Sequence, residues 1–429
     1  MSTQVSQNRA LFMSTLAFTV SFAVWTIFSI IGVQIKEDLM LTETQFSILV
    51  GLPILTGSLV RLILGIWADQ FGARFIFVST MFVSAAFTWL LTIASSYEVM
   101  LLAALGLGVA GGTFVVGISY LAKIFPSNKQ GTALGVFGMG NVGAAVTKFV
   151  APMVMVAYGW HTVAQVWAVA LVVSAVLFLM FTENEKESLK NEKRLSFMES
   201  IEPLKKLQVW RFSLYYFFVF GGFVALALWL PHYYVDVYNV DIKVAGMLAA
   251  SFSLSASLFR AAGGYLSDKY GARSVMYWAF GVSVVCCFLL SYPSTVYTIQ
   301  GVKSDIEFSL SMGVIPFTVL LFILGFVMSL GKAAIYKHIP IYYPNHVGSV
   351  AGIVGLVGGL GGFVLPIMFG LMNDYLNVWT SCFMLLFVLV SIALIWMTVA
   401  IRRMEKEKYP VLKEPQDFPE MANMNKLEG

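Results

Sequence analysis

Two arginines stand inside long apolar stretches of this sequence. Arg61 and Arg260 are each followed by glycine four residues later, aspartate eight later, glycine eleven later and arginine thirteen later. A guanidinium held away from water needs groups that accept its hydrogen bonds, and its planar fork fits a small planar oxyanion with two bonds. The pair therefore predicts an anion-binding site that two equivalent segments build together.

The residues that follow the arginines form a loop motif that occurs twice. The glycines allow two helices to approach closely, and the aspartate and arginine can pair across the loop and latch two helices. We predict that the motif gates and stabilises and does not bind substrate. Its members are Gly65, Asp69, Gly72 and Arg74 in the first copy and Gly264, Asp268, Gly271 and Arg273 in the second.

The composition places these segments in a membrane. Of 429 residues, 59% are hydrophobic and 12% are charged, whereas a soluble domain carries about 25% charged residues. This excludes a soluble enzyme, a nucleic-acid-binding protein and a disordered chain. The net charge of +4 is too small to indicate a polyanionic partner. Cys286, Cys287 and Cys382 lie in apolar runs, so we expect no disulfide framework, metal site or cofactor.

Twelve apolar runs reach the length of about 20 residues that a membrane helix needs. They predict an all-α membrane protein of twelve transmembrane helices in two pseudo-symmetric six-helix bundles. The expected parts are an N-terminal bundle (1–182), a linker (183–210), a C-terminal bundle (211–401) and a tail (402–429). The runs are 11–33, 46–67, 75–94, 100–122, 131–157, 163–181, 212–233, 244–266, 275–290, 314–336, 347–372 and 381–401.

The short loops on the two sides of these spans differ in positive charge. Because basic loops stay in the cytoplasm, the difference places both termini inside. The loops on the side of the termini hold Arg9, Arg74, Lys123, Lys129, Lys269 and Arg273, and the opposite loops hold Lys36, Lys243 and Lys303.

The position of the two arginines in the bilayer makes them costly. Arg61 precedes Asp69 by eight residues, which places it about 12 Å above the loop. A cation near the bilayer centre costs about 2.5 to 3.5 kcal/mol on insertion scales. The cores of the twelve spans contain no Asp or Glu to neutralise the two arginines. The alternative to an anion site is that each arginine snorkels or binds backbone carbonyls.

Two glycine-rich segments accompany the arginines. The first contains Gly140, Asn141 and Gly143, and the second contains Gly358 and Gly359. In a membrane, glycine lets helices touch and exposes backbone amides to a ligand. Helix packing alone remains an alternative for most of these glycines. The amide side chain between two glycines indicates a polar contact.

The loop motif resembles that of the major facilitator superfamily, and the glycine-rich pair resembles the signature motifs of its nitrate/nitrite porter family. The second glycine-rich segment departs from the family pattern because it has no asparagine. The resemblance implies a small planar anion held between the two arginines, flanked by aromatic rings and a tyrosine hydroxyl. The residues that fit these positions are Phe22, Phe114, Tyr216 and Phe220.

Two lysines are candidates for proton coupling. Lys148 follows Asn141 by seven residues on a similar helix face. Aligning the halves on Pro126 and Pro344 places Lys332 opposite Phe114, at the depth of the binding site. A lysine held out of water beside two arginines could exchange a proton near neutral pH. The alternative is a lysine that snorkels to the membrane surface.

The resemblance implies a monomeric transporter of nitrate, nitrite or both in the bacterial cytoplasmic membrane, working by alternating access between its two halves. Its partners would be the anions, protons and the lipid bilayer, with no nucleic acid. We favour proton-coupled nitrate uptake, with nitrate/nitrite antiport as the alternative. A larger organic anion is a second alternative, against which the tight aromatic set counts. A membrane sensor would need a larger soluble domain, and no enzyme machinery is present.

Overall fold

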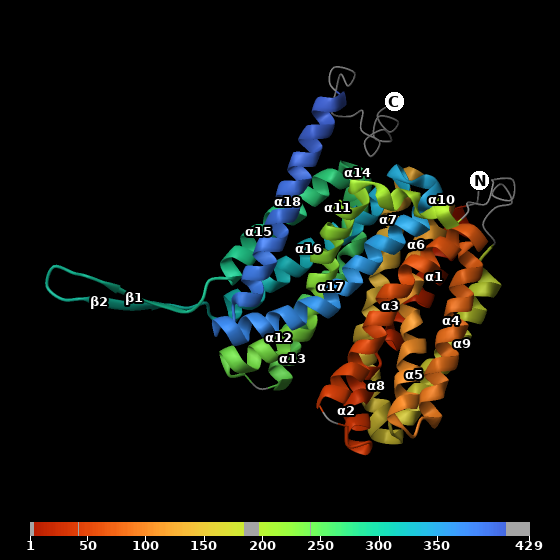
Figure 1. The fold of residues 1–429 in the computed structure, drawn as a ribbon, viewed down its shortest axis with the longest axis horizontal. Coiled ribbons are helices and arrows are strands. Elements are labelled where there is room, and N and C mark those ends of the chain that lie inside the picture. Colours follow the sequence, from red (N-terminus) through yellow and green to blue (C-terminus); the bar gives the residue numbers. More distant parts are fainter. Residues whose placement is uncertain (1–3, 42, 184–196, 241, 409–429) are drawn as a thin grey trace.

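The computed structural model describes residues 4–41, 43–183, 197–240 and 242–408. Within these ranges twelve helical segments are long and apolar enough to cross a membrane. The predicted fold class is therefore confirmed, and the helices stand side by side in two bundles (Figure 1). We call the face at which α1 begins and α18 ends the terminal face.

The N-terminal half consists of the first six membrane spans. Short 3-10 turns interrupt the fourth and fifth spans, where the sequence predicted continuous helices. The helices are α1 (Gln4–Trp25), α2 (Phe28–Asp38), α3 (Glu43–Phe71), α4 (Ala73–Leu90), α5 (Tyr97–Gly108), α6 (Thr113–Ile124), α7 (Gln130–Gly138), α8 (Gly143–Tyr158) and α9 (Trp160–Phe181), with 3-10 turns η1 (Leu91–Ile93), η2 (Val109–Gly112), η3 (Ser127–Lys129) and η4 (Met139–Val142).

The C-terminal half repeats this arrangement after two short helical turns. A β-hairpin joins α15 to α16, which the sequence analysis did not predict. The elements are α10 (Phe197–Ile201), η6 (Glu202–Lys205), α11 (Leu207–Tyr216), η7 (Phe217–Gly222), α12 (Phe223–Tyr238), α13 (Ile242–Leu258), α14 (Arg260–Tyr270), α15 (Ala272–Leu290), β1 (Thr295–Ile299), β2 (Ile306–Leu310), α16 (Val314–Tyr342), η8 (Pro344–His346), α17 (Val347–Leu376) and α18 (Ser381–Lys408).

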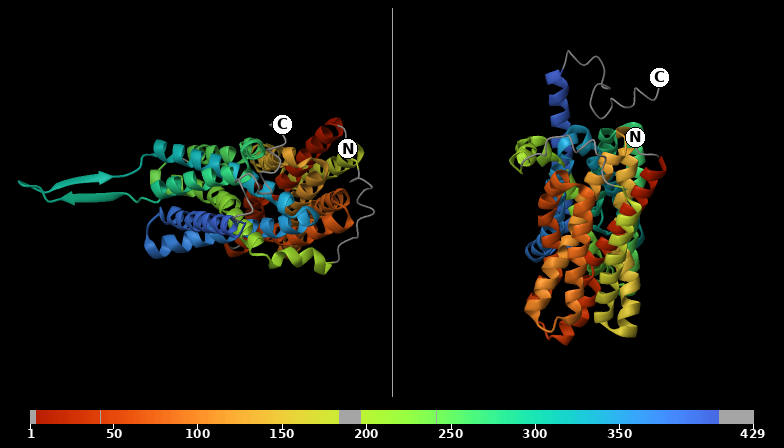
Figure 2. Two further views of the ribbon diagram at one scale, coloured as in Figure 1. Left: turned by 90° about the horizontal axis from the view of Figure 1, so that it is seen from above. Right: turned by 90° about the vertical axis from the view of Figure 1, so that its right-hand side faces the viewer.

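The two halves meet most extensively where α3 packs on α17 and α7 packs on α14. These helices come together near the terminal face, whereas α2, α5 and α8 lie apart from α12 and α13 at the other end (Figures 1 and 2). The crossings are equivalent in the two halves. A side chain on Gly65 would overlap the backbone of Gly348, and one on Gly264 would overlap the backbone of Gly131. Glycine is therefore required by the packing of one half on the other.

The remaining motif glycines shape the turns that follow α3 and α14. Gly72 has φ of +95° and Gly271 has φ of +82°. L-residues with a side chain rarely adopt such angles, and glycine adopts them at no steric cost. Each turn starts the next membrane helix directly, at Ala73 and Ala272.

Candidate functional site

The fold buries both arginines between the two halves. Arg61 on α3 is 1% exposed and Arg260 at the start of α14 is 0% exposed. Both guanidinium groups lie over the ring of Phe114 on α6, with the carbon Cζ 6.0 Å from the ring centre for Arg61 and 4.8 Å for Arg260. Neither arginine points to lipid, so the alternative of snorkelling is wrong.

The two arginines differ in their hydrogen bonds. Arg61 donates from Nε to the carbonyl of Gly111 (3.0 Å) and from Nη1 to the carbonyl of Gly355 (2.7 Å), which belongs to the other half. Backbone carbonyls therefore do bind this arginine. Arg260 donates from Nη2 to the hydroxyl of Tyr216 over 3.5 Å. Its Nε and Nη1 have no partner among the described residues.

Two further buried donors near Arg260 lack an acceptor in the part of the chain that the structure describes. Lys332 on α16 is 0% exposed, and its charge interacts with that of Arg260. Its ammonium lies 3.8 Å from the ring centre of Phe223. Asn141 lies one turn beyond Gly138, the residue against which the Arg260 side chain packs. Within the described ranges, neither Nζ of Lys332 nor Nδ2 of Asn141 has a hydrogen-bond partner.

In the described part of the chain, no carboxylate forms an ion pair with Arg61, Arg260 or Lys332. Three cationic side chains therefore share one buried region that contains no counter-ion from the described ranges. Burying such charges is costly unless they are paired. The region fits an anion that accepts the open hydrogen bonds of Arg260, Lys332 and Asn141.

Aromatic rings enclose the guanidinium groups. Tyr216 stacks on Phe220 with ring centres 5.0 Å apart, and Phe220 lies 5.2 Å from Cζ of Arg61. These rings and Phe114 are predicted site residues that the structure brings together. Phe22 is a neighbour of the site, because its ring contacts Phe18 and Trp25.

Sequence reasoning missed two rings that contact the arginines. Trp25 lies 5.4 Å from Cζ of Arg61, and Tyr336 lies 5.8 Å from Cζ of Arg260. Tyr336 also meets Tyr216 edge-on, with ring centres 4.8 Å apart. Helical spacing could have found both, because Tyr336 follows Lys332 by four residues and Trp25 follows Phe22 by three.

The predicted glycines divide into two groups. Gly358 packs against the ring of Tyr216, and a side chain on Gly359 would overlap Ser58 and approach Nη1 of Arg61 to 3.2 Å. These two glycines make room for site residues. Gly140 packs on Phe18 and Gly143 on the backbone of α1, so helix packing accounts for both.

The membrane helices are interrupted around the arginines. The 3-10 turn η2 contains Gly111, whose carbonyl binds Arg61, and η4 contains Asn141. The π-helical segment η7 follows Tyr216 and contains Phe220, and α14 begins at Arg260 itself. Irregular helical turns of this kind are common at functional sites, because they free backbone groups and redirect side chains.

The aspartates of the loop motif bind the opposite half. Asp69 accepts hydrogen bonds from the backbone amides of Gly348 (3.1 Å) and Ser349 (3.0 Å) at the start of α17. Asp268 accepts from the amides of Gly131 (2.9 Å) and Thr132 (2.6 Å) near the start of α7. A carboxylate at a helix N-terminus is stabilised by the unpaired amides and the helix dipole.

This arrangement corrects the expected pairing of each aspartate with the arginine in its own loop. Arg74 donates to the hydroxyl of Thr182 (3.1 Å) and the carbonyl of Leu179 (2.5 Å), at the end of α9. Arg273 lines a cavity inside the C-terminal half. The aspartates thus latch the two bundles to each other, and Arg74 fastens its own bundle.

Lysines accompany both aspartates. Lys337 lies 2.6 Å from Asp268 and also donates to the carbonyl of Ser127. Lys337 is buried in this ion pair. Lys123 lies 4.0 Å from Asp69. Lys148 belongs to α8, and its side chain lies outside the described part of the structure, so its predicted role stays a prediction.

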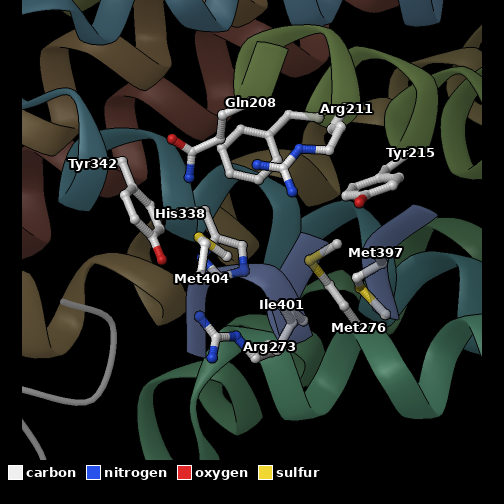
Figure 3. A pocket seen from close by; sticks show the side chains of 11 residues that line it. Gln208, Arg211, Tyr215, Arg273, Met276, His338, Tyr342, Met397, Ile401 and Met404 are labelled. Carbon is white, nitrogen blue, oxygen red and sulfur yellow. The ribbon is translucent and has the colours of Figure 1, made fainter. Parts of the chain in front are cut away.

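A small cavity near the terminal face is lined by neither Arg61 nor Arg260 (Figure 3). Arg211 and Arg273 point into it from the beginnings of α11 and α15, and His338 enters from α16. Of the predicted site residues, Arg273 lines it. The described residues contain no cluster of three His, Cys, Asp or Glu side chains that could hold a metal ion.

Comparison with known proteins identifies the family. The family model of the Major Facilitator Superfamily matches residues 13–314 and 244–425. A probable nitrate/nitrite antiporter of Thermus thermophilus, NarK1, is 43% identical over 94% of both chains. The chain belongs to the nitrate/nitrite porter family of the major facilitator superfamily. The family prediction is therefore confirmed, and the members of this family are transporters, not enzymes.

Other relatives of this porter include a nitrite extrusion protein of Bacillus subtilis, 30% identical over 84% of this chain and 86% of the relative. A probable nitrate transporter of Staphylococcus epidermidis, NarT, is 29% identical over 90% and 94%. Among solved structures, the human organic anion transporter MFSD10 superposes with a TM-score of 0.72, covering 91% and 99% of the two chains. At 13% identity that likeness concerns the fold alone.

Proposed function

We propose that this protein carries nitrate and nitrite across the bacterial cytoplasmic membrane by alternating access. The observation that carries the proposal is the buried group of Arg61, Arg260 and Lys332, which has no carboxylate partner among the described residues. A planar oxyanion would accept hydrogen bonds from the open nitrogens of Arg260 and add the missing negative charge. The names of the relatives as nitrate and nitrite transporters support the same substrate.

The enclosure of the site favours a small flat anion over an organic one. The parallel rings of Tyr216 and Phe220 are 5.0 Å apart, and Tyr336 meets Tyr216 edge-on. These rings occupy the space that the carbon skeleton of a larger anion would need. Nitrate and nitrite are small, planar and singly charged, so they require little room beyond the reach of the two guanidinium groups.

Alternating access would arise from the contacts that join the two halves. Arg61 of one half donates to Gly355 of the other, and Asp69 and Asp268 each bind a helix start across the interface. We propose that the terminal face is cytoplasmic and that these contacts keep it closed. Breaking them would let the halves separate there while the anion remains between the arginines.

Two coupling modes remain for the transport cycle. Lys332, buried next to Arg260, favours proton-coupled nitrate uptake, because an ammonium there and a bound anion stabilise each other. The name of the Thermus relative favours nitrate/nitrite exchange. In exchange, one anion replaces another and no residue needs to carry a proton. We place proton-coupled uptake first because of the position of Lys332.

Counterflow in proteoliposomes tests both parts of the proposal. Vesicles loaded with nitrate or left empty are assayed for uptake of labelled nitrate and nitrite, with and without an imposed proton gradient. Uptake that follows the gradient in empty vesicles supports symport, and uptake that ignores the gradient and demands internal anion supports exchange. Absence of both activities in folded protein, with uptake of an organic phosphate or carboxylate instead, contradicts the substrate assignment.

A further inference from the structure

The β-hairpin between α15 and α16 stands away from both helical bundles. Strands β1 and β2 are antiparallel and pair only with each other in the described structure. The hairpin extends sideways from the C-terminal half, across the direction of the membrane helices (Figures 1 and 2). A two-stranded hairpin alone in water is at best marginally stable, so this extension needs a surface to lie on.

The pairing register gives the hairpin two different faces. Residues directly opposite each other in an antiparallel pair place their side chains on the same face. Tyr297 pairs with Phe308 and Ile299 with Ile306, while Thr298 pairs with Glu307 between them. The apolar face, defined here as Tyr297, Ile299, Ile306, Phe308 and Leu310, also carries Thr295 at its base. The opposite face carries Val296, Thr298, Glu307 and Ser309.

All five side chains of the apolar face are exposed to at least 38% in the protein alone. The rings of Tyr297 and Phe308 stack on each other with centres 5.3 Å apart. Contiguous exposed apolar side chains of this kind mark a surface that another phase or molecule covers. The opposite face is mainly polar, with Val296 as its one apolar member, and such alternation indicates a contact on one side and water on the other.

The ends of the hairpin fix its distance from the bilayer. Helix α15, a candidate membrane span, ends at Leu290, and β1 begins at Thr295. Strand β2 ends at Leu310, and the next candidate span begins at Val314. The start of β1 and the end of β2 therefore each lie within five residues of a membrane span, on the side opposite the terminal face. Tyrosine and other amphipathic side chains are enriched at this depth of the membrane.

We propose that the apolar face of the hairpin lies in the lipid headgroup and upper acyl region of the leaflet opposite the terminal face. Tyr297 and Phe308 enter the lipid, and Thr298, Glu307 and Ser309 face the water. The hairpin then fastens the outer ends of α15 and α16 to the membrane surface. This inference stands apart from the transported substrate, because it rests on strand register and on the membrane spans alone.

A bilayer fits the observations better than a protein partner does. The candidate membrane spans before β1 and after β2 place the base of the hairpin near the membrane surface. The hairpin runs across the direction of these helices (Figure 1), and so along that surface. The apolar face carries no charged group that would give a protein partner specific contacts, and Thr295 is its one polar residue. A protein contact is therefore treated as an outcome of the test.

Spin labels on neighbouring residues of β2 measure which face meets lipid. Single cysteines replace Phe308 or Ser309 in the full chain, reconstituted in bilayers of phosphatidylethanolamine and phosphatidylglycerol. The labels are compared for collisions with oxygen, which concentrates in lipid, and with a water-soluble nickel chelate. The native Cys286, Cys287 and Cys382 are buried, and the chain without an added cysteine measures their background. We expect several-fold higher oxygen preference at Phe308→Cys than at Ser309→Cys.

A second pair guards against a label that distorts the hairpin. Ile306→Cys and Glu307→Cys are also neighbours on opposite faces. We expect the same contrast in oxygen preference between these two labels, measured in liposomes of the same lipids. Equal exposure of both faces to the nickel chelate, at both pairs, overturns the proposal. Shielding of the apolar face from oxygen and nickel alike also overturns it, because that pattern indicates a protein contact.

Discussion

Arg260 and Arg61 occupy equivalent positions in the two halves, yet their surroundings give them different tasks. Arg61 is anchored by two backbone carbonyls, one from each half, whereas two nitrogens of Arg260 have no acceptor within the described structure. The anion would therefore take its strongest hydrogen bonds from Arg260. The position of Arg61 at the ligand would depend on how the two halves are placed, since its hydrogen bond to Gly355 crosses the interface.

Replacing Arg260 should weaken anion binding more than it weakens the fold. Arg260→Lys keeps the charge but loses the planar fork, and a hydrogen bond to a charged group contributes about 1.5 to 3 kcal/mol. We expect the apparent affinity for nitrate to fall about 10- to 100-fold, measured as the nitrate concentration that half-maximally raises the melting temperature. Arg402→Lys, at an exposed position near the end of α18, is the matched control. Unchanged affinity in Arg260→Lys would remove Arg260 from the site.

Lys332 offers a test of the coupling mode. If it carries the proton, Lys332→Gln should abolish the stimulation of nitrate uptake by an inward proton gradient, while counterflow of nitrate against nitrite persists. The reason is that glutamine is polar and only one atom shorter than lysine, but has no titratable group that could exchange a proton. Initial uptake rates between pH 5.5 and about 8 provide the measurement. Lys303→Gln, exposed in the hairpin turn, should behave as wild type. A pH profile of Lys332→Gln that matches wild type would exclude this lysine as the carrier.

Among the elements, α17 shows how a glycine-rich helix serves the site. A side chain at Gly358 would overlap the ring of Tyr216, while Gly370 on the same helix has nothing within 4 Å. Tyr216 is the hydroxyl partner of Arg260 and the stacking partner of Phe220. Gly358 of α17 thus leaves room for the ring of Tyr216. At the crossing with α3, by contrast, the glycines of α17 leave room for the backbone of another helix.

Gly358→Ala should therefore displace Tyr216 and reduce transport strongly, with protein that still folds and inserts. Overpacking of this kind costs about 1 to 3 kcal/mol, and we expect a fall in nitrate uptake of about tenfold or more. Gly370→Ala gives the same chemical change at an open position and should retain uptake. Expression and size-exclusion profiles of both variants control for folding. Equal uptake by the two variants would contradict the positioning role of Gly358.

The sequence predicted some of these elements and could not predict others. The membrane spans followed from apolar runs. The internal repeat placed Arg61 and Arg260 at the same depth, and the family resemblance added Phe114. The breaks at η2, η4 and η7 stayed hidden, because glycine and aromatic residues are compatible with a continuous membrane helix. The partners of Asp69 also stayed hidden, since residues 348 and 349 are distant in sequence and only the packing of two bundles brings them to the carboxylate.

For the whole molecule, the decisive contacts lie between the bundles near the terminal face. Asp69 fastens α3 to the start of α17, and Asp268 fastens α14 to the start of α7. Asp268 has a further bond from Lys337, which belongs to its own half. Replacing one of these aspartates removes the acceptor from the amides of one helix start. The contact between the two bundles at the terminal face is then weakened at that helix. A transporter of this design would then spend more time open at the terminal face.

A reporter for this opening is Val115, which is buried on α6 against Gly355 of the other half. In a Val115→Cys background, Asp69→Asn should raise the rate of labelling by a membrane-impermeant maleimide from the terminal face about tenfold or more. The estimate follows from the loss of charge on two hydrogen bonds, worth about 1.5 kcal/mol or more. Asp236→Asn is the control, because Asp236 pairs with His232 in its own helix α12. Labelling that stays at the background rate in Asp69→Asn, or that rises equally in Asp236→Asn, would mean that the aspartate does not hold the halves together.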